Sequence, residues 1–181
     1  MTSESEPDTD YPARKVVLAD SEVVIRAIVE EEWQEDTGRS SPGIFQNPDV
    51  SVTRINEIGM AEGIAIVKRD VEVVGRPGRD VRGVGRISVA TIKAVGEKEF
   101  PVKKPGPVIY FQVWEEKTLP RNGKPGNDYH AEIVPYTDAG RTLARARVTP
   151  AYSKMLSKAL HVFELDRKGG VVSETHPEEM P

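Results

Sequence analysis

Five residues in the first third of the chain have side chains that proteins use to bind a phosphate or a carboxylate. Arg26 lies in an apolar run, Arg39, Ser40 and Ser41 follow one another in a polar turn, and Arg54 ends a second apolar run. Guanidinium groups match such anions with paired hydrogen bonds, and hydroxyls and turn amides add donors. The pattern predicts one anion site made by these five residues. The alternative is that each arginine pairs with a carboxylate nearby in the sequence.

A second group of polar residues alternates with apolar ones near the middle of the chain. Asp128, His130 and Glu132 would share one face of a strand. His130 is therefore a candidate general base, and the group resembles part of a metal site. Because the chain has no cysteine and a third ligand is not evident, we expect no metal and no cofactor. A polar strand side that faces solvent is the simpler interpretation.

Positive charge is concentrated in residues 141–158, which contain no acid. This basic run could follow the phosphates of a nucleic acid or another polyanion. The alternative is that it forms the solvated face of a helix. Its basic residues are Arg141, Arg145, Arg147, Lys154 and Lys158.

The elements that would position these residues form a mixed pattern. Runs rich in β-branched and aromatic residues predict strands, and a Ser88 cap before residues 89–95 predicts a helix. Thr149 and Pro150 begin a second helix whose apolar residues recur up to Phe163. The predicted strands cover residues 22–29, 50–55, 84–87, 108–114 and 128–134, and further helices are expected at about 56–67 and 141–147.

Length and composition predict a single α+β domain over residues 14–165, with a mixed or mostly antiparallel sheet and a C-terminal amphipathic helix. Residues 1–13 form an acidic segment and residues 166–181 a polar one, and we expect both tails to be disordered. Without a cysteine, the chain has no disulfide. No apolar run is long enough to span a bilayer, so we expect a soluble, cytoplasmic protein that does not contact a membrane.

The order of these pieces resembles a family of small uncharacterised bacterial proteins. The resemblance spans about residues 21–148 and rests on EVVIRAI, SSPGIF, SVTR, GVGRISVATIKAVG and HAEI, an SS-x-x-x-F … SV-x-R … HA pattern. It implies one soluble bacterial domain and brings no activity that can be transferred. This chain departs from the pattern by a longer insertion at about residues 67–80 and a longer stretch before His130.

No known catalytic motif is evident. The glycine-rich stretch at residues 75–85 is neither a P-loop nor a dinucleotide fingerprint, and no nucleophile elbow is present. We therefore expect a binding or interaction module in a bacterial gene cluster, with a protein partner. The alternatives are an enzyme that acts on a nucleotide or phosphorylated ligand, similar to an ADP-ribosyltransferase, or nucleic-acid binding through residues 141–158.

Overall fold

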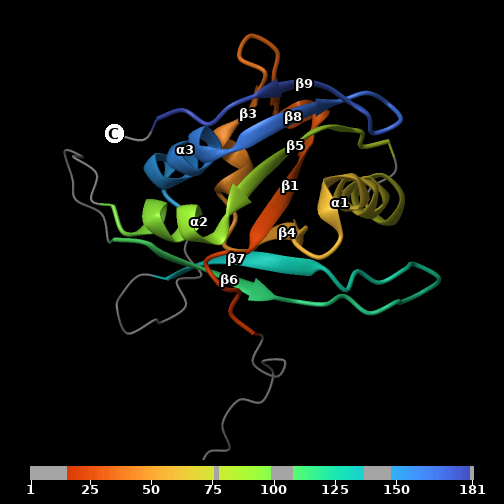
Figure 1. Cartoon of the computed structure of the whole chain (residues 1–181), viewed down its shortest axis with the longest axis horizontal. Coiled ribbons are helices and arrows are strands. Elements are labelled where there is room, and N and C mark those ends of the chain that lie inside the picture. Colours follow the sequence, from red (N-terminus) through yellow and green to blue (C-terminus); the bar gives the residue numbers. More distant parts are fainter. Residues whose placement is uncertain (1–15, 76–77, 99–107, 137–147, 180–181) are drawn as a thin grey trace, which may run out of the picture.

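A seven-stranded sheet with the order β6-β7-β4-β1-β5-β8-β9 forms the centre of the structure, a computed structural model that describes residues 16–75, 78–98, 108–136 and 148–179 (Figure 1). Each strand pairs antiparallel with its neighbours. The strands of the sheet are β1 (Val23–Val29), β4 (Val50–Arg54), β5 (Val81–Ser88), β6 (Tyr110–Glu115), β7 (His130–Tyr136), β8 (His161–Leu165) and β9 (Val171–Thr175).

Helices cover both faces of this sheet. Figure 1 shows α2 and α3 on one side and α1 on the other. A π-helical segment, η3, continues α1, and the short strands β2 and β3 pair with each other outside the sheet. The remaining elements are α1 (Gly59–Lys68), α2 (Val89–Gly96), α3 (Pro150–Ala159), η1 (Glu30–Glu32), η2 (Pro42–Phe45), η3 (Arg69–Gly75), β2 (Trp33–Gln34) and β3 (Arg39–Ser40).

The central strand β1 contributes to a hydrophobic core on each face. Val24 and Ile28 belong to the cluster that contains α2 and α3, whereas Ile25 and Ala27 belong to the cluster that contains α1. Side chains alternate across a strand, so a strand that is covered on both faces must be apolar at nearly every position. This explains the apolar run of β1 and leaves Arg26 as its exception.

The predicted α+β class is confirmed, and so is the mostly antiparallel sheet. The C-terminal helix exists but is shorter than predicted, because α3 ends at Ala159 and β8 begins at His161. Phe163, which the helical spacing placed in the helix, instead lies on β8 and packs in the core beside α1. Residues 161–165 pair with the edge of β5, which would otherwise be open, and this pairing outweighs the helical spacing of their apolar residues.

The C-terminal segment differs from the expected disordered tail. Residues 171–175 form β9, which pairs with β8 along the edge of the sheet. The acidic segment 1–13 and the predicted helix at 141–147 lie outside the described residues. Within the described part of the chain, no helix is both long and apolar enough to cross a membrane.

Candidate functional site

A cavity of about 470 Å³ opens on the face of the sheet that α1 covers. Its floor is formed by β1 and β4, one wall by η3, and another wall by the hairpin arm, residues 116–129, which connects β6 to β7. Val67, Val71 and Val74 make part of the lining apolar, and Ser51 and Thr53 present hydroxyl groups. The cavity thus combines an apolar wall with convergent polar groups, as small-molecule sites do.

Arg26 lies where two strands of the floor separate. The β1–β4 ladder contains the pairs Val24↔Arg54 and Ile25↔Thr53 and does not continue beyond them. Past this point the Arg26 Nη1 donates to the Ser51 carbonyl at 3.2 Å. The guanidinium therefore donates to a strand carbonyl that would accept from a backbone amide of β1 if the β1–β4 ladder were longer.

The described residues provide no close counter-ion for the charge of Arg26. Among them, the buried Nε has no hydrogen-bond partner, and no carboxylate lies within 4.0 Å of the guanidinium. Burial lowers the pKa of Arg26, the Glu32 carboxylate opposes this change, and the charge of Arg79 lowers the pKa further. Since an arginine keeps its proton even so, Arg26 is a half-buried cation with one buried donor, Nε, that has no partner among the described residues.

Three more cations line the cavity. Arg79 lies 3.7 Å from Glu32, Arg121 lies on the exposed hairpin arm, and the Lys124 Nζ donates to the Val74 carbonyl at 2.5 Å. Asp70 also lines the cavity, but its two oxygens are occupied by Arg69 and Asn127, at 2.7 and 2.8 Å. The lining is therefore positive on balance.

His130 faces the same cavity, so it lies near Arg26 as a single site would require. It pairs with Thr53 of β4 across the sheet. Its Nδ1 lies 2.7 Å from the Glu116 carbonyl oxygen. Because a carbonyl only accepts, Nδ1 carries a proton, which leaves Nε2 as the ring nitrogen that can offer a lone pair.

The structure does not bring the other four predicted anion-binding residues into this cavity. Arg39 donates to the carbonyls of Lys158 and His176 and forms an ion pair with Glu178 at 3.5 Å. Arg54 forms an ion pair with Glu115 at 3.2 Å. Both arginines therefore form structural ion pairs, but the alternative prediction of partners nearby in the sequence is wrong for them, because Glu178 and Glu115 are far away in sequence.

The two serines have structural roles. The buried Ser40 hydroxyl lies 3.0 Å from that of Ser157 on α3. The Ser41 side chain accepts a hydrogen bond from the Gly43 amide and caps the short helix η2. Of the five residues, Arg26 alone lines the cavity.

Three residues of the predicted polyanion-binding run, Arg141, Arg145 and Arg147, lie outside the described residues. Lys154 is exposed on α3, while Lys158 is engaged in an ion pair with Glu178. Polyanion binding through this run stays a prediction.

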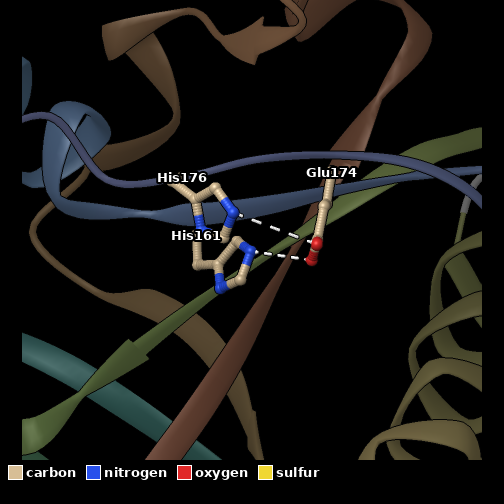
Figure 2. Close-up of side chains that lie close together, drawn as sticks. All are labelled: His161, Glu174 and His176. Atoms are coloured by element: carbon tan, nitrogen blue, oxygen red, sulfur yellow. Dashed lines mark hydrogen bonds and ion pairs between the residues drawn. The ribbon is translucent and has the colours of Figure 1, made fainter.

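A further polar cluster lies on β8 and the C-terminal segment (Figure 2). The Glu174 carboxylate lies 3.0 Å from the Nε2 of His161 and 3.9 Å from the Nε2 of His176. On the other side of the ring, His161 Nδ1 lies 3.1 Å from the Arg86 Nη2. Because arginine only donates, Nδ1 is the acceptor, and Nε2 carries the proton that points to Glu174.

Arg79, Arg121 and Lys124 were not predicted from the sequence as site residues. They lie in polar, glycine- and proline-rich connections, whose composition indicates loops but not what those loops approach. Only the packing of η3 and the hairpin arm against the sheet assembles them.

Searches against protein-family models, curated proteins and solved structures found no match to this chain.

Proposed function

We propose that this protein is a binding module for a small phosphorylated ligand, such as a nucleotide, which occupies the cavity between β1, β4, η3 and the hairpin arm. The observation that carries the proposal is Arg26, a half-buried arginine that lines the cavity and has no carboxylate partner among the described residues. A charge that is partly removed from water and has no close counter-ion destabilises the fold unless a ligand or solvent offsets this cost. An anion that enters the cavity would supply the missing counter-charge.

The remaining lining agrees with a ligand of this class. Arg121 and Lys124 on the arm can approach the outer oxygens of a phosphate, and Ser51 and Thr53 add hydroxyl donors. The apolar wall suits the non-phosphate part of the ligand, and about 470 Å³ falls within the range of small-molecule pockets. A protein partner, as predicted from the sequence, is compatible with this role and stays a prediction.

The test compares two variants that remove the same charge. Arg26→Gln deletes the cavity cation, while Arg82→Gln deletes an arginine that is already paired with Glu164 at 2.9 Å and does not line the cavity. Inorganic phosphate, adenosine and its mono- and diphosphate are titrated by calorimetry and thermal shift. We expect the phosphorylated compounds to stabilise both the parent protein and Arg82→Gln. The Arg26→Gln variant should bind them on the order of tenfold more weakly or worse, because one charged hydrogen bond contributes about 1.5–3 kcal/mol.

Two results would contradict the proposal. One is that no phosphorylated compound stabilises the parent protein. The other is an equal loss of affinity in Arg26→Gln and Arg82→Gln, which would indicate a general charge effect. If Arg26→Gln does not fold, Arg121→Ala on the exposed arm replaces it, and unchanged affinity in that variant would count against the site.

A further inference from the structure

Three potential metal ligands meet on the β6–β7 hairpin, on the same face as the cavity. Glu116, His130 and Glu132 each offer one ligand atom, and these atoms lie within 4.8 Å of one another. The register explains the meeting: Trp114 is the partner of Glu132, and the Glu116 amide donates to the His130 carbonyl at 2.9 Å. Residues opposite one another or two apart share a face of a hairpin.

The histidine of this group has the proton arrangement that a metal ligand needs. Its Nδ1–H donates to a backbone carbonyl, that of Glu116. Such a contact holds the imidazole in one orientation, makes Nε2 the coordinating nitrogen and raises its basicity. All three side chains are half-buried, so the group is neither a loose surface cluster nor closed to an ion.

We propose that Glu116, His130 and Glu132 bind a divalent metal ion through one imidazole nitrogen and two carboxylates. A donor set of nitrogen and oxygen without sulfur suits Mn²⁺ or Zn²⁺. Three protein ligands leave coordination positions open, and because His130 lines the cavity, these positions would face it. The proposal does not depend on the phosphorylated ligand, since the metal can be tested alone.

The cluster in Figure 2 has similar residue types, but the ring nitrogen of its histidine that faces the carboxylate is protonated. Its His161 accepts from Arg86 at Nδ1, so the nitrogen near Glu174 carries a proton instead of a lone pair. A metal at that nitrogen would have to displace the proton, break the Arg86 contact and tolerate a guanidinium beside it. The hydrogen bonds of each histidine thus distinguish a metal-binding arrangement from an ion-pairing one.

The first test uses the three histidines of the chain as reporters. Mn²⁺ is added in substoichiometric amounts to the full-length, chelator-treated protein, and the imidazole NMR signals are followed. We expect the His130 signals to broaden first, while those of His161 and His176 stay sharp. Earlier or equal broadening of His161 and His176, or no selective broadening, would overturn the proposal.

The second test uses matched substitutions in the two clusters. Glu132→Gln should weaken Mn²⁺ and Zn²⁺ binding, measured by calorimetry, on the order of tenfold or more. Glu174→Gln, the same change in the other cluster, should leave the affinity unchanged. Equal affinity in Glu132→Gln and the parent protein, or a comparable loss in Glu174→Gln, would refute the site. Circular dichroism without metal establishes that both variants are folded; if Glu132→Gln is not, Glu116→Gln takes its place.

Discussion

At the scale of single residues, three arginines show how partners decide a role. Arg54 and Arg82 reach carboxylates at 3.2 and 2.9 Å, so their charges are compensated within the protein. Arg26 has the same side chain, but within the described part of the chain it reaches only a backbone carbonyl, at 3.2 Å. Its unbalanced charge, and not its residue type, makes it the candidate ligand-binding residue.

A prediction at this scale concerns Glu178, whose pKa is lowered by a hydrogen bond from Lys158 and by the charges of Lys158 and Arg39. A carboxyl whose pKa is lowered by folding stabilises the fold at any pH above its ordinary pKa, here 4.5. This stabilisation is lost as the pH falls through the lowered pKa. We therefore expect Glu178→Gln to melt below the parent protein at neutral pH. The difference should disappear in acid.

Melting curves of the parent protein and Glu178→Gln between pH 7 and about pH 3 would measure this effect. Glu179→Gln, at the exposed neighbouring position, is the control and should match the parent protein throughout. A difference that persists unchanged at low pH would show that the loss comes from something other than the charge of Glu178.

At the scale of elements, the change from α3 to β8 shows the limits of periodicity. Tyr152, Met155 and Leu156 lie buried on one helix, as their spacing predicts. Phe163 continues the spacing but belongs to a strand. The helical spacing of α3 and the strand pattern of β8 overlap in sequence, and pairing with β5 decides that Phe163 belongs to the strand.

We predict that Leu156→Ala lowers the free energy of unfolding by about 2–5 kcal/mol, because Leu156 is 1% exposed in the larger core and its truncation leaves a cavity. Lys154→Ala, on the exposed side of the same helix, should change it by less than about 0.5 kcal/mol. Urea denaturation measures both. Similar values for the two variants would show that α3 does not carry the core that the structure assigns to it.

At the scale of the whole molecule, the C-terminal segment completes one edge of the sheet. β9 pairs with β8, and Glu178 beyond it reaches Arg39 and Lys158 on two other elements. The segment therefore links α3, β3 and the sheet edge, although its composition is that of a polar tail.

We predict that truncation after Asp166 lowers the melting temperature by several degrees and increases aggregation, since it removes these contacts and leaves β8 as an unpaired edge. Differential scanning calorimetry and light scattering provide the measurement. Deletion of residues 1–13, which the sequence predicts to be disordered, is the comparison and should leave the melting temperature unchanged. If both deletions are equally harmless, β9 contributes little to the fold.

The sequence by itself determined the local elements. The β-branched run of β1, the Ser88 cap of α2 and the Thr149-Pro150 start of α3 were each predictable, because their causes lie within a few residues. The same reasoning identified Arg26 as exceptional in an apolar strand and placed His130 and Glu132 on one face.

The tertiary structure alone decided which of these residues act together. Glu116 joins His130 through the register of two strands, and Arg121 reaches the cavity because the hairpin arm folds toward η3. Arg39, adjacent in sequence to two serines, instead pairs with Glu178 at the other end of the chain. Local preferences act over a few residues, whereas charge pairing and ligand geometry depend on distances in space, which only the packed sheet and its register establish.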